Sequence, residues 1–173
     1  MILDNYITLD EEFYLIQNIY NMPFSNALKR RVQQYGYKYS YDRNITNLKF
    51  ADPIPEFLVF LLNRINMQFG KNFNQIIINE YIPGQGISPH IDDTTLFGDT
   101  IISVSLNTHV IMNLEEQELF LQRRSALILH GYKRYELKHG IKAKKSDIIN
   151  GVKYPRSTRV SITFREIVNL SFI

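Results

Sequence analysis

The sequence of 173 residues contains no cysteine, and this absence restricts the chemistry open to the protein. Disulfide bonds, thiolate zinc sites and iron–sulfur clusters are excluded, so any bound metal must be held by histidine and carboxylate ligands. A chain without cysteine also fits a reducing compartment. The N-terminal segment lacks the basic and apolar regions of a secretory signal, which predicts an intracellular protein, cytoplasmic or nuclear.

Long apolar runs, internal repeats and Ser/Gly-rich linkers are absent as well. Since no run approaches the roughly 20 apolar residues that span a bilayer, we expect no membrane segment. The length suits one domain over residues 1–173, which we expect to be a monomer. The net charge of +3 and the pI near 9.0 are mildly basic, which permits a nucleic-acid partner without requiring one.

The first part of the sequence carries helix signals. Thr8 or Asp10 can cap a helix over residues 11–20, where apolar residues recur at helical spacing. A second helix is predicted over residues 55–67, because a proline with an acidic neighbour opens it and Gly70 ends it. This N-terminal region of about residues 1–73 is expected to support and cover the rest of the chain.

A period of two replaces the helical period in other parts of the sequence. Residues 31–41 alternate aromatic with polar side chains, which indicates a strand or an extended ribbon. From residue 75 onwards short alternating segments are separated by turn residues at 83–86, 97–99 and 130–131. The predicted strands are 76–82, 100–106, 110–112, 119–121, 126–129, 135–138 and 159–164.

Helices followed by a run of short strands are typical of one fold class. The order predicts a mainly β protein with flanking helices, in which two sheets form a jelly roll. We expect this core to cover residues of about 74–168, with the N-terminal region as its α/β support.

A candidate metal site begins with His90 and Asp92, which follow a turn and lie two residues apart. In an extended segment such residues point to the same side, so one ion can bind both. The pair alone is a weak signal, because a solvated histidine in a surface turn is the commoner explanation of such a pair. A third ligand must come from elsewhere, and His109, His130 and His139 are candidates. Two imidazoles and a carboxylate leave three positions open, which suits Fe(II) with a 2-oxo acid and O2.

Two arginines in the last predicted strand offer a partner for such a metal. Arg159 and Arg165 are six residues apart, so both face one side of the strand while apolar residues face the other. Buried arginines need anions, and a dicarboxylate such as 2-oxoglutarate supplies two. Asn79 and Tyr81 alternate in the same way on an earlier strand and could bind the same ligand. An exposed polar face of an edge strand is the alternative for either pair.

Taken as a set, these motifs resemble the AlkB family of Fe(II)- and 2-oxoglutarate-dependent dioxygenases. The similarity covers nearly the whole chain, in blocks that keep the order of the family. The blocks are residues 28–39, 79–92, 97–106, 131–141 and 159–165. The resemblance implies a double-stranded β-helix, which agrees with the jelly roll expected from the strands.

The resemblance also implies roles for the candidate residues. His90, Asp92 and His139 would carry the iron, because His139 occupies the family's His-Gly-Ile position. Arg159 would bind the distal carboxylate of 2-oxoglutarate together with Tyr81. Arg165 and Asn79 would lie near the carboxylate next to the metal. The implied reaction oxidises a substrate C–H bond with O2 and releases succinate and CO2, giving either demethylation or a stable hydroxylation.

The residues expected to face the substrate differ from those of the family's DNA-repair members. Their acidic residue two positions after the metal aspartate is Thr94 here, with Asp93 beside it, and there is no tryptophan to stack a base. The segment 28–39 is closer to the branch that contains the tRNA wobble-uridine hydroxylase. Its aromatic and basic residues could stack bases and hold phosphates, or could pack on the core as a lid.

We therefore expect a modified or alkylated base in nucleic acid as the substrate, with single-stranded or tRNA-like RNA favoured. The candidate substrate contacts are Arg31, Tyr37, Tyr39, Asp93, Thr94 and Arg134. One alternative is the same chemistry on a protein or small molecule. Another is a jelly-roll binding module without catalysis.

Overall fold

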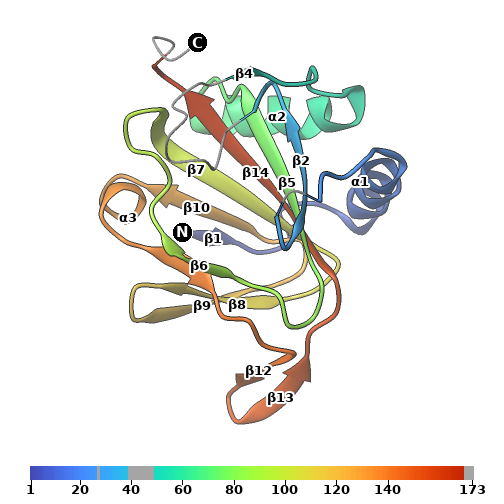
Figure 1. Cartoon of the computed structure of the whole chain (residues 1–173), viewed down its shortest axis with the longest axis vertical. Helices are drawn as coiled ribbons and strands as arrows, with labels where there is room; N and C mark the ends of the chain where they lie inside the picture. Colours follow the sequence, from blue (N-terminus) through green and yellow to red (C-terminus); the bar gives the residue numbers. More distant parts are fainter. Residues whose placement is uncertain (27, 39–48, 170–173) are drawn as a thin grey trace.

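Two antiparallel sheets form the centre of the computed structural model, which describes residues 1–26, 28–38 and 49–169 (Figure 1). The larger sheet has the order β1 (Ile2–Leu3), β10 (Ala126–His130), β7 (Phe97–Leu106), β14 (Arg159–Ile167), β5 (Gln75–Tyr81) and β2 (Arg31–Tyr35). The smaller sheet has the order β6 (Ile87–His90), β11 (His139–Ile141), β8 (Val110–Leu114) and β9 (Gln117–Leu121). Sequence neighbours are often far apart in this order, as a jelly roll requires. The predicted fold class is confirmed.

Two helices lie in the N-terminal part of the chain, close to where the sequence predicts them. Helix α1 (Leu9–Asn21) begins with a capping box, in which Thr8 Oγ1 accepts from the backbone N–H of Glu11 and the Glu11 carboxylate accepts from that of Thr8. The cap is therefore Thr8 and not Asp10. Helix α2 (Glu56–Phe69) follows Pro55 and ends at Gly70 in the left-handed region, with φ of 59°.

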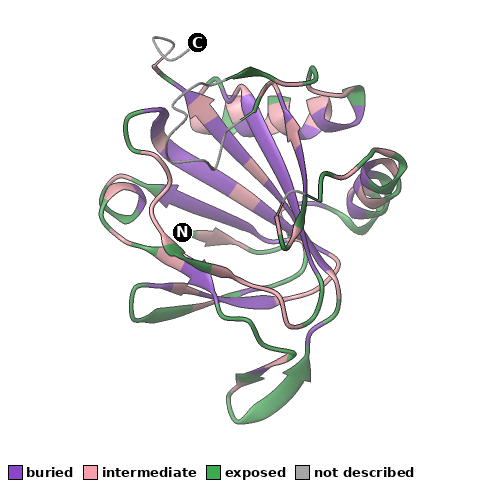
Figure 2. Cartoon of the chain, viewed as in Figure 1, coloured by how far each residue is buried: buried purple, intermediate pink, exposed green. Residues whose placement is uncertain are grey.

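The main hydrophobic core lies between these helices and the outer face of the larger sheet. Strand alternation explains how the sheet serves two purposes at once. In β14, Val160, Ile162 and Phe164 pack in the core with the helices, while Arg159 and Arg165 face the other side. The central strands of the larger sheet, β10, β7, β14 and β5, are accordingly buried along most of their length (Figure 2). The predicted division of this strand into an apolar and a polar face is confirmed.

Two further pairs of strands lie outside the two sheets. A short pair, β3 (Tyr37–Lys38) and β4 (Lys49–Phe50), follows β2 after a break at Gly36, whose φ is 77°. The predicted ribbon over 31–41 is thus interrupted, and its last residues lie outside the described ones. A hairpin of β12 (Ser146–Ile149) and β13 (Val152–Pro155) leaves the sheets, and most of its side chains are exposed. Because most of these side chains are exposed, the hairpin shows no alternation of apolar and polar residues from which the sequence could predict it.

Two local predictions were wrong. Residues 135–138 do not form a strand: helix α3 (Tyr132–Tyr135) occupies the start of this segment, because Gly131 turns the chain and its carbonyl accepts from the N–H groups of Arg134 and Tyr135. Residues 97–99 do not form a turn but open strand β7, where Phe97 is buried and pairs with Ile167. Among the described residues, no helix has both the length and the apolar character needed to cross a membrane.

Gly86 allows the turn before β6 to pass close to the strand β11. An alanine Cβ there would lie 2.1 Å from the backbone oxygen of Ile141 and 2.9 Å from the backbone nitrogen of Ala143. Gly86→Ala should therefore displace β11 and lower the free energy of unfolding by about 1–3 kcal/mol in urea titrations. Gly98→Ala is the matched control, because its Cβ would meet only side-chain atoms, at 3.3 Å or more. Equal stability of the two variants would contradict this packing.

Candidate metal and dicarboxylate site

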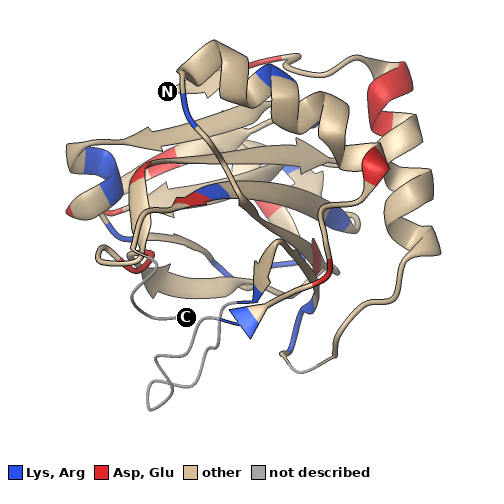
Figure 3. Cartoon of the chain, turned by 90° about the horizontal axis from the view of Figure 1, so that it is seen from above, with Lys and Arg blue, Asp and Glu red and all other residues tan. Residues whose placement is uncertain are grey.

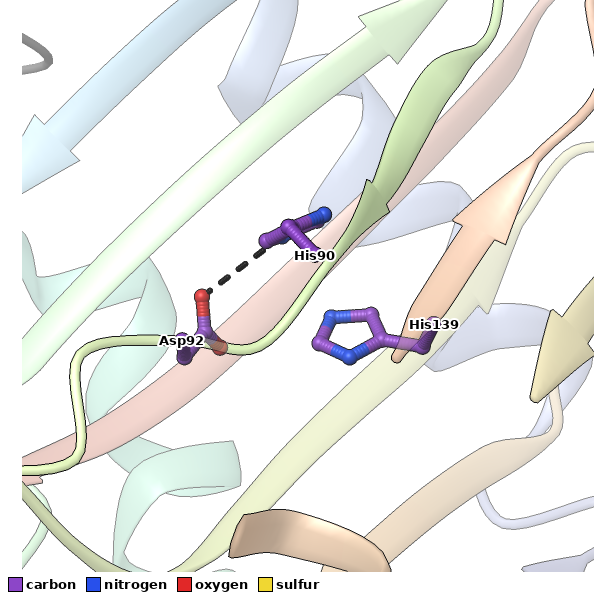
Figure 4. A group of neighbouring side chains, drawn as sticks. All are labelled: His90, Asp92 and His139. Carbon is purple, nitrogen blue, oxygen red and sulfur yellow. Dashed lines mark ion pairs between the residues drawn. The ribbon is translucent and has the colours of Figure 1, made fainter. Parts of the chain in front are cut away.

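Three side chains that could ligate a metal meet where β6 and β11 run side by side. His139 opens β11 and pairs in register with His90 at the end of β6, and Asp92 lies in the loop that follows (Figure 4). One ligand atom from each of the three residues lies within 4.8 Å of the others. The His90 and His139 ring centroids are 4.4 Å apart. The chain pairing therefore selects His139 from the three candidate histidines.

The orientation of His90 is determined by a backbone contact. Its Nδ1 lies 2.9 Å from the carbonyl oxygen of Ser88, and since a carbonyl only accepts, Nδ1 carries the proton and donates. Nε2 is then left as the lone-pair nitrogen, 3.7 Å from Oδ1 of Asp92. A ring nitrogen directed in this way by its opposite N–H is the usual arrangement for a metal-binding histidine.

The charge states of the other two residues also suit a divalent cation. Burial lowers the pKa of His139 to about 4, although the Asp92 carboxylate opposes this effect, so the imidazole is neutral at neutral pH. Burial works against ionisation of Asp92 too, but the positive charge of Arg165 and contributions from the histidines hold its pKa below the usual value. A carboxylate and two imidazoles form the donor set of non-haem Fe(II) sites, so the residues fit iron.

A second layer of contacts supports the loop that carries Asp92. The guanidinium of Arg134, which is 2% exposed, donates to the backbone carbonyls of Asp92 at 2.9 Å and Asp93 at 2.7 Å. It also reaches the carbonyls of Phe97 and Gly98, at 3.3 and 3.2 Å. Arg134 was predicted to contact the substrate, but the structure places it against this loop, where it determines the position of a ligand.

A cavity of about 690 Å³ lies between the two sheets. His90, Asp92 and His139, which we call the metal group, are part of its lining. Strands of both sheets contribute to it. The larger sheet supplies polar residues of β5 and β14 and the apolar Leu127 and Leu129 of β10, and the smaller sheet supplies the apolar Met112 of β8 and Ile141 of β11. The lining includes the four predicted dicarboxylate contacts Asn79, Tyr81, Arg159 and Arg165. Its size is within the range of ligand pockets and exceeds what a five-carbon dicarboxylate needs.

Arg159 is the clearest indication of an anion in this cavity. Its side chain is buried, and Nη2 donates to Ser105 Oγ at 2.7 Å, while Nε has no hydrogen-bond partner among the described residues. Burial lowers its pKa to about 10, so the group is still charged at neutral pH. A buried charged donor without a partner is costly, and a carboxylate would satisfy it. The site therefore fits 2-oxoglutarate.

Arg165 links this strand to the metal group. Its Nη1 lies 3.3 Å from Oδ1 of Asp92, its Nε donates to Gln75 Oε1 at 2.7 Å, and its guanidinium lies 4.1 Å from the centroid of the Phe97 ring. Asn79 accepts from Nε of Arg30 at 2.9 Å. Arg165 is thus at the metal end of the cavity, and Arg159 lies six residues away along the same face.

The structure distinguishes two neighbouring arginines that the sequence could not separate. Arg31 donates two hydrogen bonds to the Glu80 carboxylate, at 2.7 and 2.8 Å. This pair lies on the face of the sheet that packs against α1, whose Tyr20 hydroxyl also donates to Glu80. Arg30 faces the other way, lines the cavity and lies 6.0 Å from the Tyr81 ring centroid. Arg31 was the predicted substrate contact, whereas Arg30 occupies the cavity wall. Strand alternation shows that Arg30 and Arg31 face opposite sides, but it cannot show which of them faces the cavity.

The remaining predicted substrate residues lie in different surroundings. Asp93 lines the cavity, and its Oδ1 accepts from the N–H and hydroxyl of Thr95 and from the N–H of Leu96. Thr94 is exposed and outside the cavity lining. Tyr37 packs on the Phe50 ring, with centroids 5.3 Å apart. Tyr39 lies outside the described residues. The substrate roles of these residues stay predictions.

The other two candidate histidines are elsewhere. His109 lies 3.7 Å from the buried Asp147, which Arg156 holds through two hydrogen bonds. His130 is largely exposed and lies 2.9 Å from Thr100 Oγ1. Neither lines the cavity.

Comparison with known proteins supports the chemistry of this site. The family model of the 2OG-Fe(II) oxygenase superfamily matches residues 10–165. An uncharacterised protein of Acanthamoeba polyphaga mimivirus is 34% identical over 96% of this chain and 84% of its own length. The Arabidopsis thaliana protein named alkylated DNA repair protein ALKBH8 homolog is 32% identical over 97% of this chain. The solved structure of OsALKBH1 aligns over 96% of this chain and 97% of its own, with a TM-score of 0.67 and 16% identity.

A further relative is longer than this chain. The Xenopus tropicalis protein named tRNA (carboxymethyluridine(34)-5-O)-methyltransferase alkbh8 is 30% identical over 96% of this chain. The chain spans 58% of the Arabidopsis protein and 31% of the Xenopus protein. The activities named for those whole proteins therefore belong to longer molecules.

Removal of the Arg159 guanidinium should weaken 2-oxoglutarate binding without affecting metal binding. Arg159→Met keeps the apolar part of the side chain but loses the charge-assisted hydrogen bonds, which corresponds to a roughly 10- to 150-fold weaker affinity. Anaerobic calorimetry with Mn(II)-loaded protein measures 2-oxoglutarate affinity, and Mn(II) affinity in the same variant is the control. Unchanged 2-oxoglutarate affinity would show that this arginine does not hold the dicarboxylate.

Arg31→Ala should act on stability. Arg31 lowers the pKa of Glu80, so the pair stabilises the fold above the unfolded pKa of glutamate, and this contribution is lost as the pH falls through the lower folded pKa. The variant leaves a buried carboxylate without its cation, with the Tyr20 hydroxyl still donating to it, and should lose about 1–3 kcal/mol at pH 7, with a smaller loss below about pH 4. Arg30→Ala, which removes the hydrogen bond to Asn79 and leaves the pair of Arg31 with Glu80 intact, is the control for urea unfolding at both pH values. A loss independent of pH would contradict the assignment.

Proposed function

Because the chain belongs to the 2OG-Fe(II) oxygenase superfamily and is AlkB-like within it, we propose that it oxidises a modified or alkylated base in nucleic acid, with RNA favoured. The protein is a dioxygenase by family, and the proposal concerns its substrate. The observation that carries it is one cavity lined both by His90, Asp92 and His139 and, from the larger sheet, by Arg159, whose buried Nε has no hydrogen-bond partner among the described residues.

The residues of this chain divide the work of the site. When bound, Fe(II) and 2-oxoglutarate together use O2 to oxidise a substrate C–H bond, with release of succinate and CO2. His90, Asp92 and His139 would hold the metal, and Arg159 would orient the dicarboxylate from the far end of the cavity. Arg165, in contact with Asp92, keeps this carboxylate ionised and directed toward the metal position. The part of the cavity beyond the dicarboxylate is then available for a base.

Several observations favour nucleic acid, and RNA in particular. The Xenopus relative is named for an activity on tRNA, and the Arabidopsis relative for repair of alkylated DNA. The segment 28–38, which resembles the tRNA-modifying branch of the family, contributes Leu28, Lys29 and Arg30 to the cavity lining. Thr94, which replaces the acidic residue of the DNA-repair members, is exposed. A base can reach the metal group only when it leaves its stack, which single-stranded RNA permits at little cost.

Nucleoside mass spectrometry tests the proposal directly. Total RNA, synthetic alkylated RNA and alkylated DNA oligonucleotides would each be incubated with protein, Fe(II), 2-oxoglutarate, O2 and ascorbate. Loss of a methyl group, or gain of one oxygen on a nucleoside, should accompany an equal amount of succinate. We expect RNA nucleosides to change faster than DNA nucleosides.

Single-residue variants of the metal ligands and of a distant histidine provide the controls. His90→Ala and Asp92→Ala should abolish both nucleoside change and succinate formation, since each removes one of three ligands. His130→Ala removes an exposed histidine outside the cavity and should retain activity. The nucleic-acid proposal would be wrong if nucleosides stayed unchanged and no nucleic acid stimulated succinate formation. Protein and small-molecule substrates would then be tested.

A further inference from the structure

Three segments that are distant in the sequence meet beside the mouth of the cavity. The turn 82–86 lies between them, since the Gln85 amide donates to the carbonyl of Lys29 at 2.8 Å and the N–H of Gly84 donates to the carbonyl of Lys144 at 3.0 Å. Lys29, Arg30 and Gly86 also line the cavity. The turn therefore connects the segment 28–30 to the segment 142–145 along one edge of the site.

This edge carries an excess of positive charge. Charges of both signs are spread over the chain as a whole (Figure 3). Here, however, Lys29, Lys144 and Lys145 are all exposed, and no carboxylate of the described residues forms an ion pair with them. Lys142 is only 3.9 Å from Glu118, and both of these side chains are largely exposed. We call Lys29, Arg30, Lys144 and Lys145 the basic rim.

The backbone under the basic rim is anchored. The N–H of Arg156 donates to the carbonyl of Lys145 at 3.0 Å, and the Arg156 guanidinium donates to the carbonyl of Lys142 at 2.9 Å. The same guanidinium forms a buried ion pair with Asp147, at 2.6 and 2.7 Å. This pair holds the base of the β12–β13 hairpin, which projects from the sheets (Figure 1). The rim lysines thus extend from a backbone whose position the buried pair determines.

Arg30 joins the rim to the interior of the cavity. Its Nε is held by Asn79, and its guanidinium lies near the Tyr81 ring, so this side chain reaches inward while Lys29 is exposed to solvent. A ligand that enters the cavity past Arg30 must therefore leave its remaining part close to Lys29, Lys144 and Lys145.

We propose that the basic rim binds the phosphate backbone of single-stranded RNA on both sides of the nucleotide whose base enters the cavity. This inference rests on the proposed function, because it presupposes a nucleic-acid substrate. A flipped or unpaired base keeps its flanking phosphates outside the pocket, and exposed lysines without carboxylate partners neutralise phosphates at the smallest desolvation cost. Such contacts are independent of the base, so the rim positions the strand and the cavity selects the base.

The salt dependence of RNA binding tests the proposal. Fluorescence anisotropy with a labelled single-stranded oligouridylate would be measured over a range of KCl concentrations for the intact chain, Lys29→Ala, Lys144→Ala and Lys145→Ala. Each lost phosphate contact should make the slope of log K against log salt shallower by about 0.7. Lys145→Arg should keep the slope of the intact chain. Lys133→Ala is the matched control, since it removes an exposed lysine on α3, which lies away from the rim (Figure 1).

The outcomes separate this inference from the function on which it rests. Shallower slopes in the three rim variants, with an unchanged slope in Lys133→Ala and unchanged thermal midpoints, would support the basic rim. Tight RNA binding with the same slope in all variants would overturn the rim but leave the proposed function intact. Equal affinity for a duplex of the same length would overturn the assignment to single strands. If the intact chain bound no RNA at low salt, the rim proposal and the RNA preference of the proposed function would both fail.

Discussion

The contact between the Arg165 guanidinium and the Asp92 carboxylate, at 3.3 Å, joins the larger sheet to the loop that carries the metal ligands. Arg165 lies on a strand whose opposite face is packed against two helices, so its position is determined by the main hydrophobic core. The charge of Arg165 offsets the burial of Asp92 and keeps that carboxylate ionised. The packed core thereby determines both the position and the charge of Asp92, although this ligand lies in a loop.

A second arginine secures the same loop from beneath. Arg134 donates to four backbone carbonyls between Asp92 and Gly98, and these bonds need no particular side chains in the loop. The pairing of β6 with β11 then brings His139 to His90. The metal group therefore depends on three separate constraints, which are the register of two short strands, a buried cation below the loop and a second cation beside it.

Burial of positive charge is a recurring feature of the site, and it has a common physical cause. Arg134, Arg159 and Arg165 are each less than 5% exposed, and such groups require compensation by acceptors. Backbone carbonyls supply it for Arg134 and a carboxylate contributes for Arg165, whereas Nε of Arg159 has no acceptor among the described residues. This difference supports the proposal that Arg159 binds a ligand carboxylate. The exposed lysines of the basic rim bear little desolvation cost and suit the phosphate backbone that we propose outside the cavity.

The sequence by itself determined the features that follow from local periodicity. The helix capped near Thr8, the helix that ends at Gly70 and the two faces of the strand 159–165 all depend on residues close together in the chain, whose spacing reports which side is buried. The pair His90 and Asp92 was visible for the same reason. The family resemblance, not the spacing, singled out His139 before the fold was known. The spacing of apolar residues gave a wrong strand at residues 135–138, where α3 ends, and it did not predict the exposed β12–β13 hairpin.

Only the tertiary structure decided which residues share a space. It showed that Arg30 and not Arg31 faces the cavity, because this depends on the register of β2 against β5 and a shift of one residue exchanges the two faces. It also turned Arg134 from a predicted substrate contact into a support of the metal loop, and it brought Lys29 and Lys144 to opposite ends of one turn. Contacts of this kind join segments many residues apart, and the spacing of residues along the chain carries no record of them.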